Sequence, residues 1–456
     1  MNRSDDIESL RALIDGPVLT HDDSGYDDEV AAFNTTAQHR PEVVVGATSA
    51  QDVQHAVTWA AARDLPVAVQ ATGHGAVVSY AGGVLVSTKR MQDLRVDPNS
   101  RTVTVGAGVK WRAVVDAAAP FELAPLSGSS SDAGAVGYTL GGGLPLLGRT
   151  FGFASDHVRS FDLVTADGSL KRVSLDENAD LFWALRGGKA NVGIVTSMTI
   201  GLVPAATIYG GAVYFDGTYA EALLRAYAQW APSLPDSITT SFKFLRLPPM
   251  PEVPEILREK LSVQICVAHV GDPEEGSRLL EPILQAAPIL LDDIREMPYT
   301  DADLIHRDPD HPLPVHECSA LMNDLTEEAI DALLSATGPS SECPLVMVEL
   351  RHLGGALSLS EPVSDAVGAR DAAYCLFLLG ILLGPAADAV PGALVSVMGE
   401  MAPYTNGRTF VNLHGAPTTD TDRARPWSPD IYDRLRHIKA TSDPGDLFRF
   451  GHALTT

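Results

Sequence analysis

A histidine between two glycines, Gly73-His74-Gly75, is the group with the clearest chemical potential in this chain. A neutral imidazole is a competent nucleophile near neutral pH. Glycine lets the backbone pass within contact distance of a ligand, and backbone N–H groups in glycine-rich loops can hold a pyrophosphate. A second glycine-rich block lies at 134–148. The two blocks indicate a large flat or phosphorylated ligand, although glycine clusters alone are equally compatible with simple tight turns.

The common nucleotide and hydrolase motifs are absent from the sequence. Gly188-Lys189 lacks both the upstream glycine and the following Ser or Thr of a P-loop. The segment that begins at Gly106 (GAGVKW) lacks the third glycine of a Rossmann site. No G-x-S-x-G or H-E-x-x-H motif occurs. The glycine-flanked histidine therefore needs another explanation.

An ordered series of motifs resembles the FAD-binding domain of the vanillyl-alcohol-oxidase superfamily. The motifs are Thr72-Gly-His-Gly, Gly137-Tyr-Thr-Leu-Gly-Gly-Gly, Phe151-Gly-Phe-Ala-Ser-Asp, Val164-Thr-Ala-Asp-Gly and Asn191-Val-Gly-Ile-Val-Thr. Phe410-Val-Asn-Leu and Asp443-Pro-Gly-Asp-Leu-Phe-Arg resemble the closing motifs of the branch that contains berberine-bridge enzyme and 6-hydroxy-D-nicotine oxidase. The resemblance runs from about Tyr26 to Ala453.

The resemblance implies an α+β, two-domain FAD-linked oxidase fold. We expect an α+β FAD-binding domain at 1–205, a substrate domain at 206–414 with a mixed or antiparallel sheet flanked by helices, and a C-terminal segment at 415–456 that returns to the first domain. The sequence pattern agrees with this division. It predicts a capped helix from Ser49 to Ala60 and a strand at 65–70, then longer strands (208–215, 239–247, 261–270, 345–353) separated by helices (274–285, 327–336).

The histidine that matches His74 bonds covalently to the 8α-methyl of the flavin in that family. Ser130 stands where some members carry a cysteine that forms a second bond, and serine is a poorer nucleophile than a thiolate, so we expect one bond only. Tyr138 replaces a branch histidine, and Lys189 stands where glycine is usual. The other residues that the resemblance places around FAD are Gln70, Ala71, Thr72, Gly73, Gly75, Gly134, Gly137, Gly141, Gly142, Asp156, Arg186, Gly193, Val195 and Asn412. A turn-capping role is an equal alternative for Asp156.

The catalytic groups are harder to predict. Oxidation by a flavin needs a group that accepts a proton near the substrate carbon. Asn412 matches the asparagine of a Tyr-x-Asn motif, but Phe410 replaces the tyrosine and removes a base there. The remaining candidates are Glu349, Arg351, His352, Tyr404 and His316. A salt-bridged or solvated structural role is the stronger alternative for the three strand residues at 349–352.

A cluster of His306, His311, His316 and Cys318, with three aspartates between them, offers side chains that can bind metal ions. Its spacing and prolines fit no common zinc motif, so we predict no metal and favour a segment that lines the substrate pocket.

The overall charge excludes several classes of partner. A net charge of −25 would repel nucleic acid and anionic membranes, so neither is expected as a partner. No secretory signal is readable at the N-terminus, and the longest apolar run, 372–384, is too short to span a bilayer. A cytoplasmic location is therefore expected, and a homodimer is compatible with the sequence.

The sequence thus predicts a flavoprotein oxidase. It would oxidise a C–O or C–N bond of a small organic molecule with covalent FAD and pass the electrons to O2, releasing H2O2; by analogy, natural-product biosynthesis is a suitable setting. A dehydrogenase with another electron acceptor, and a flavin-binding protein without redox turnover, are the alternatives.

Overall fold

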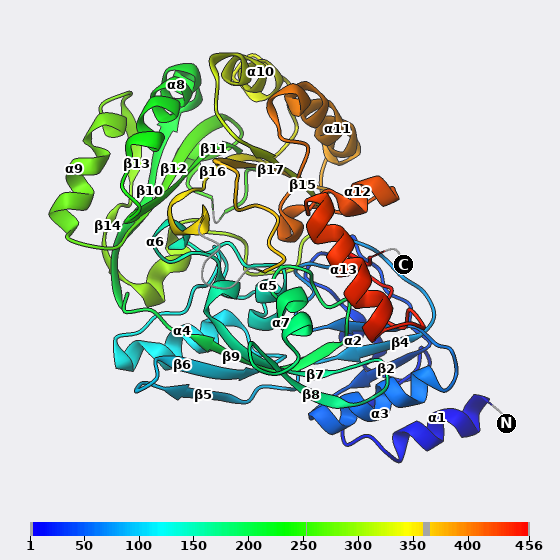
Figure 1. Cartoon of the computed structure of the whole chain (residues 1–456). Coiled ribbons are helices and arrows are strands. Elements are labelled where there is room, and N and C mark those ends of the chain that lie inside the picture. Colours follow the sequence, from blue (N-terminus) through cyan, green and yellow to red (C-terminus); the bar gives the residue numbers. More distant parts are fainter. Residues whose placement is uncertain (1–2, 252, 359–364, 455–456) are drawn as a thin grey trace.

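Three β-sheets organise the chain, and the computed structural model describes residues 3–251, 253–358 and 365–454 of it. Two of the sheets lie together in the lower part of Figure 1, and the third lies above them beneath four helices. We call residues 3–205 the two-sheet region. The predicted α+β class is confirmed.

The first sheet carries the histidine loop. Its strand order is β1 (Val18–Leu19), β2 (Val43–Gly46), β4 (Val84–Ser87), β3 (Val67–Gln70), with the last three parallel. Helices α1 (Arg3–Arg11), α2 (Tyr26–Val30) and α3 (Ala50–Ala61) accompany it. Ser49 caps α3 by accepting a hydrogen bond from the backbone of Asp52, as the sequence predicts. Because β3 ends at Gln70, the Ala71–Gly75 loop leaves the carboxyl edge of a parallel sheet.

The second sheet carries the second glycine block. It is antiparallel, in the order β5 (Leu94–Asp97), β6 (Thr102–Gly106), β9 (Ile194–Gly201), β7 (Val158–Val164), β8 (Leu170–Ser174). Helices α4 (Trp111–Ala118), α5 (Ala135–Leu140), α6 (Gly148–Phe151) and α7 (Ala179–Leu185) follow its strands. The short α5 therefore projects the glycine-rich block toward the centre of the molecule (Figure 1).

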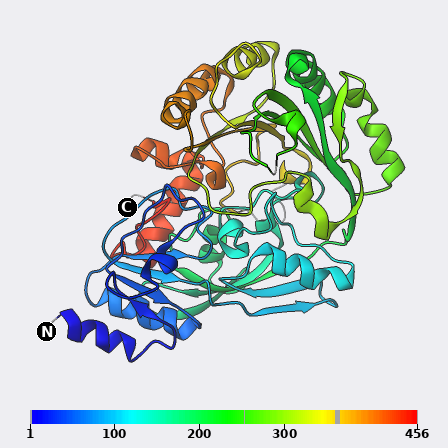
Figure 2. The same cartoon turned by 180° about the vertical axis from the view of Figure 1, so that it is seen from behind.

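The third sheet is antiparallel in all its described strand pairings. Of the two expected arrangements, mixed and antiparallel, the structure therefore has the second. Seven strands follow the order β13 (Ile289–Asp292), β10 (Thr207–Asp216), β12 (Leu261–His269), β11 (Ile238–Arg246), β16 (Met347–His352), β17 (Tyr374–Ile381), β15 (Val315–Met322), and β14 (Arg295–Pro298) pairs with β10. Helices α8 (Ala220–Trp230), α9 (Pro273–Leu284), α10 (Glu327–Thr337) and α11 (Val390–Met401) cover one face only (Figures 1 and 2).

The two faces of this sheet differ in chemistry because side chains alternate along a strand. On β16, Val348 and Leu350 point to the outer face and join the core beneath the helices. Glu349 and Arg351 point to the inner face, which is turned toward the two-sheet region. A buried face that carries charged residues is uncommon and marks a candidate site.

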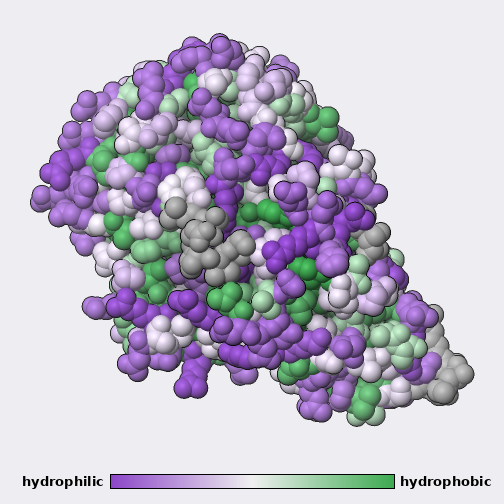
Figure 3. All heavy atoms as spheres, viewed as in Figure 1, coloured by the Kyte–Doolittle hydropathy of each residue, from purple (hydrophilic) through white to green (hydrophobic). Residues whose placement is uncertain are grey.

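The C-terminal helices return to the two-sheet region. After α12 (Asp420–Ala424), α13 (Pro429–Ser442) runs down beside α7 (Figure 1). Leu435 and Ile438 of α13 join the same core as Trp183 of α7. On the face seen in Figure 3, hydrophilic residues predominate over the surface, in keeping with the charge of −25. Within the described residues no helix is both long and apolar enough to cross a bilayer.

A buried ion pair fixes the end of α13. Lys439 and Asp443 are fully buried, with 2.5 Å between Nζ and Oδ2, and Asp443 also accepts hydrogen bonds from the backbone of Leu447 and Phe448. Asp443→Ala would remove the fully buried partner of Lys439 and leave only the partly exposed Asp446, so we expect a loss of about 3 kcal/mol in the free energy of unfolding, measured by urea denaturation. The control Asp446→Asn, at a partly exposed partner of Lys439, should cost about 1 kcal/mol or less. Equal effects of the two variants would contradict this account.

Candidate active site

The loop after β3 presents His74 in a buried, neutral state. Gly73 has φ +75°, and a side chain on it would meet the backbone of Ala32. The His74 ring stacks on Phe33 with 3.8 Å between centroids, and its Nδ1 lies 2.9 Å from Thr72 Oγ1. Burial lowers the pKa of His74 to about 4, so the imidazole is uncharged at neutral pH. Its buried Nε2 has no hydrogen-bond partner within the described chain.

The two glycine blocks meet beside this histidine. A Cβ atom placed on Gly134 would lie 3.5 Å from Ala71 and 3.6 Å from Thr72 Oγ1. A Cβ on Gly75 or Gly137 would instead meet nothing within 4 Å, so both backbones border open space. The bare backbone and the unpartnered His74 nitrogen fit a large ligand with polar groups, as FAD requires.

Tyr138 stands on α5 next to this space. Its ring makes an edge contact with Trp111, and burial raises the pKa of its hydroxyl well above the ordinary value. The hydroxyl is buried and has no hydrogen-bond partner among the described residues. A neutral phenol there can donate a hydrogen bond to a ligand but cannot supply a charge.

Asn412 joins the second glycine block to the C-terminal part of the chain. Its Nδ2 donates to the backbone oxygen of Tyr138 at 2.9 Å, and its Oδ1 accepts from Lys189 Nζ. A Cβ atom on Gly141 would lie only 2.0 Å from Asn412 Oδ1, so any other residue there would displace the Asn412 side chain. Burial lowers the pKa of Lys189 to about 8, although Glu317 acts in the opposite direction. A lysine at this glycine-like position, with φ +62°, therefore brings a buried amino group to the site.

A charged cluster occupies the inner face of the large sheet. The antiparallel register places Lys243 of β11 directly opposite Glu349 of β16. Lys243 Nζ lies 2.8 Å from His306 Nδ1, and both nitrogens lie 3.7 Å from Glu349 Oε1. Arg351 Nε donates to Glu349 Oε2 at 2.8 Å. We call Lys243, His306, Glu349 and Arg351 the sheet cluster.

The protonation states of the sheet cluster follow from its packing. Burial alone would raise the pKa of Glu349, but Arg351 and Lys243 hold it well below its ordinary value. Burial, together with the charge of Lys243, lowers the pKa of His306 to about 3. The cluster therefore holds two cations, one carboxylate and a neutral histidine, and the carboxylate of Asp308 nearby balances the second cation.

A pocket lies beside the sheet cluster. It is lined by Ser129, Leu144, Pro145, Leu146, Thr239, Thr240, Ser241, Cys266, Val267, Ala268, Ile305, His306, Arg351, His352, Leu353 and Leu357. Most of these side chains are apolar or carry hydroxyl groups, as expected of a small-molecule site. Ser129 comes from the loop before α5, so the pocket lies between the large sheet and the glycine block.

Three predicted catalytic residues do not join the sheet cluster. His352 follows Arg351 and so points to the opposite face, where it lies against Tyr374 and Arg149 although it still borders the pocket. Tyr404 packs against the core beneath the helices, and His316 is exposed on β15. Only Glu349 and Arg351 of the predicted strand residues share the inner face, because alternate residues cannot all point inward.

The histidines and the cysteine at 306–318 do not come together in the structure. His306 contacts Lys243, whereas His311 lies on the surface beside Asp310. Among the described residues, no group of three or more His, Cys, Asp or Glu side chains could hold a metal ion. His306 does line the pocket, in agreement with the interpretation that was favoured for this segment.

Several residues predicted near FAD support the backbone around the site. Gln70 donates to the Ala31 carbonyl and so holds the segment that leads to Phe33. Val195 is part of the core, Gly193 packs tightly against Val164, and Gly142 has φ +95°. Arg186 is buried over the Phe182 ring, and Ser130 lies half-buried in the loop before α5.

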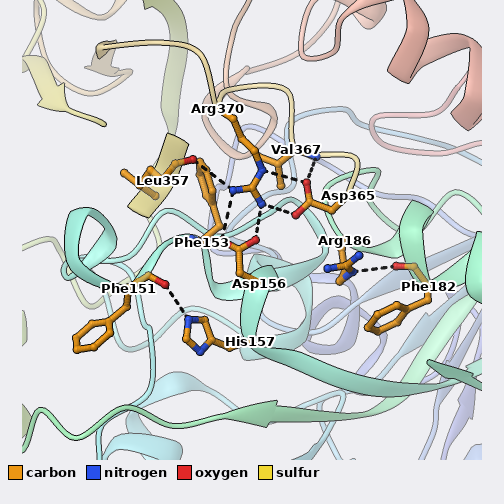
Figure 4. A network of polar contacts seen from close by, with 10 residues as sticks. All are labelled: Phe151, Phe153, Asp156, His157, Phe182, Arg186, Leu357, Asp365, Val367 and Arg370. Carbon is orange, nitrogen blue, oxygen red and sulfur yellow. Dashed lines mark hydrogen bonds and ion pairs between the residues drawn. The ribbon is translucent and has the colours of Figure 1, made fainter. Parts of the chain in front are cut away.

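Asp156 links two parts of the chain through Arg370 (Figure 4). It accepts a hydrogen bond from the Phe153 backbone at 2.8 Å, which confirms the turn-capping interpretation. Its carboxylate also pairs with Arg370, which binds Asp365 and the Leu357 carbonyl and lies over the Phe153 ring. Asp156 is thus occupied by protein partners, and it joins the two-sheet region to the segment that follows β16.

Loss of Arg370 should weaken this junction. Arg370→Met would leave Asp156 and Asp365 close together without their hydrogen-bonded cation, with only the charge of Arg186 nearby, so we expect a loss of about 2–3 kcal/mol in the free energy of unfolding. Arg370→Lys keeps the positive charge but not the planar guanidinium group. Its free energy of unfolding should therefore lie between those of the wild type and Arg370→Met. Urea denaturation curves of the three proteins check this, and identical midpoints would contradict it.

Sequence reasoning missed Lys243, Arg370 and Glu317 as parts of the site. Lys243 carried a usable signal, since it lies between Phe242 and Phe244 in a strand where its neighbours are apolar. A charged residue in that setting is buried with a partner. No comparable local signal marks Arg370 or Glu317.

Comparisons with known proteins agree with this geometry. A family model described as an FAD binding domain matches residues 41–174. (R)-6-hydroxynicotine oxidase of Paenarthrobacter nicotinovorans is 25% identical over 96% of this chain and 96% of its own length. The structure resembles BBE-like 1 of Physcomitrella patens (TM-score 0.84, 19% identity, 98% and 99% of the two chains) and a xylooligosaccharide oxidase of Myceliophthora thermophila (TM-score 0.85, 18% identity, 99% and 98%).

Proposed function

We propose that this chain oxidises a C–O or C–N bond of a small organic substrate with O2 as acceptor. Its homologues and structural neighbours are FAD-linked oxidoreductases of the vanillyl-alcohol-oxidase superfamily, among them 6-hydroxynicotine oxidase and a berberine-bridge-enzyme-like protein. The sheet cluster carries this proposal, since charged groups buried on the inner face border a pocket opposite the glycine blocks. Residues 1–205 and 415–456 would hold FAD, and 206–414 the substrate.

We propose that His74 alone bonds to the cofactor. The imidazole is neutral, stacked and oriented by Thr72, and it keeps one unpartnered nitrogen. Ser130 offers a hydroxyl instead of a thiolate at the position of a second bond. A bound FAD would supply an acceptor for two electrons and a hydride.

The chain's own residues would position the substrate and exclude water. Arg351 and neutral His306 border the pocket and can donate hydrogen bonds to an oxygen or nitrogen of the substrate. Because Lys243 donates to His306 Nδ1, the hydrogen of that ring is on Nε2. Leu144, Leu146 and Ile305 provide apolar walls that favour a substrate with a hydrocarbon surface.

Reoxidation by air tests the choice of acceptor. The purified protein is reduced with dithionite without oxygen, air is admitted, and the flavin absorbance and H2O2 are followed. An oxidase regains its oxidised spectrum within seconds and forms one H2O2 per flavin. Reoxidation over minutes would favour the dehydrogenase, and a flavin reduced by dithionite but by no member of a substrate panel would favour a protein without redox turnover.

A further inference from the structure

We propose that Glu317, on the inner face of β15, is the base that accepts the proton from the substrate's hydroxyl or amino group. The inference rests on the proposed oxidation and adds a residue to it. Glu317 is adjacent in sequence to the predicted His316 but points to the opposite face, because side chains alternate along the strand.

The other candidate bases are engaged by protein partners. Glu349 is held ionised by Arg351 and Lys243, and its low pKa makes it a weak proton acceptor. His306 uses Nδ1 to accept from Lys243, which leaves a hydrogen on Nε2. The side chain at the position of the missing tyrosine, Phe410, is buried against Phe153 in an apolar cluster.

Backbone contacts place Glu317 beside the Phe410–Asn412 segment. Two residues along β15, Ser319 Oγ accepts a hydrogen bond from the Phe410 backbone at 3.3 Å. At Glu317 itself, a Cβ atom on Gly415 would lie only 2.1 Å from the backbone oxygen. Glu317 is therefore held against the stretch that contains Asn412, whose side chain reaches α5.

The side chain of Glu317 is half-buried on the inner face of the sheet. Within the described residues it forms no hydrogen bond or ion pair, in contrast to Glu349. The charged groups that face it are Arg351 from β16 and Lys189 from the loop after α7. Burial raises the pKa of Glu317 to about 7, although both cations act in the opposite direction, and a pKa near the working pH suits a general base.

The histidines near this site carry no charge that would affect the pKa of Glu317. His452 lies near Lys189, the ring of His414 lies 5.8 Å from that of His452, and burial lowers the pKa of each histidine. Both are neutral at the pH where Glu317 titrates, so Lys189 and Arg351 set its charge. We expect Lys189→Met to raise the pKa of Glu317, because a nearby positive charge that favours the carboxylate is removed.

The proposed step balances atoms and electrons. The substrate's O–H or N–H bond breaks and the proton goes to a Glu317 carboxylate oxygen. The C–H bond of the adjacent carbon breaks, its hydrogen would pass with both electrons, as a hydride, to the bound FAD, and a C=O or C=N bond forms. The substrate loses two electrons, which O2 later takes with two protons to give H2O2, and Glu317 returns its proton to solvent.

Infrared spectroscopy tests the inference on the flavin-loaded enzyme without knowledge of the substrate. Difference spectra between about pH 5 and about pH 9 should contain the C=O stretch of a buried protonated carboxyl that titrates near pH 7. The band should vanish in Glu317→Gln, persist in the control Glu328→Gln on the exposed side of α10, and titrate at higher pH in Lys189→Met. A Glu317 that remains ionised throughout overturns the proposal.

Kinetics tests the catalytic role separately. With any alcohol or amine of a panel that reduces the wild-type flavin, Glu317→Gln should slow flavin reduction by about 10²–10⁴-fold and abolish its dependence on pH near 7, while reoxidation by O2 stays unchanged. A wild-type reduction rate in Glu317→Gln overturns the inference. If no compound reduces the wild type, the proposed function fails, and the infrared result alone decides whether Glu317 is a proton acceptor.

Discussion

Glu349→Gln is expected to destabilise the protein by about 5 kcal/mol, the largest loss among the substitutions considered. Glu349 is fully buried, accepts a hydrogen bond from Arg351, and lies between the charges of Arg351 and Lys243. Without its charge, two buried cations face a single remaining carboxylate, Asp308. Removing one member of a buried ion group leaves an uncompensated charge, which costs about 3–5 kcal/mol. Urea denaturation followed by circular dichroism measures the loss.

A double variant separates charge balance from packing. Glu349→Gln combined with Lys243→Met removes one charge of each sign, so the net charge of the cluster returns to its original value. We expect the double variant to lose about 1–3 kcal/mol less free energy of unfolding than the sum of the losses in the two single variants. Additive losses would show that the two residues do not interact and would contradict the cluster.

The pH dependence of this contribution has a definite sign. The pKa of Glu349 is lower in the folded protein than in the unfolded chain, where a glutamate titrates at about 4.3. Its stabilisation is therefore complete above that value and is lost as the pH falls below it toward the folded pKa. In Glu349→Gln, the difference in stability from the wild type should shrink in strongly acid solution.

His74→Ala is expected to abolish covalent attachment while FAD still binds. The backbones of the two glycine blocks and Asn412 remain in place in this variant, so the ligand keeps its contacts. The variant should be yellow when native but release all its flavin in guanidinium chloride. Thr72→Ala should form the bond more slowly, because Thr72 Oγ1 orients the ring.

His39→Gln is the matched control for this prediction. His39 is also buried, stacks on Tyr80, and has its pKa lowered by burial, but it lies outside the Gly73–Gly75 loop. It should keep the covalent flavin. Loss of the bond in His39→Gln, or its retention in His74→Ala, would contradict the assignment of the anchor.

Sequence patterns predicted those parts of the fold and site that depend on neighbouring residues. The capped helix at 50–61 and the strands at 207–216 and 261–269 lie within a few residues of their predicted bounds, because capping and alternation are local. The Gly73–Gly75 loop was found for the same reason. The prediction of the large sheet needed only the runs of strand-forming residues and the family resemblance.

The sheet cluster could not be predicted because three distant segments form it. Lys243 meets Glu349 only through the order β11–β16 and its register, and His306 arrives from a loop between strands. Glu317 was not predicted because the strand expected in this segment had no defined bounds, so the sequence did not show which of Glu317 and His316 faces inward. The prediction for Tyr404 was wrong. Tyr404 lies close to Phe410 in sequence, but closeness in sequence does not determine on which face of the sheet a side chain packs.

The mass of the acid-denatured chain tests the central claim most directly. We expect the mass of the polypeptide plus one FAD for the wild type, with the flavin on the proteolytic peptide that contains His74, and the mass of the bare chain for His74→Ala. A bare chain from the flavin-loaded wild type, or a flavin on the peptide that contains Ser130, would contradict the account.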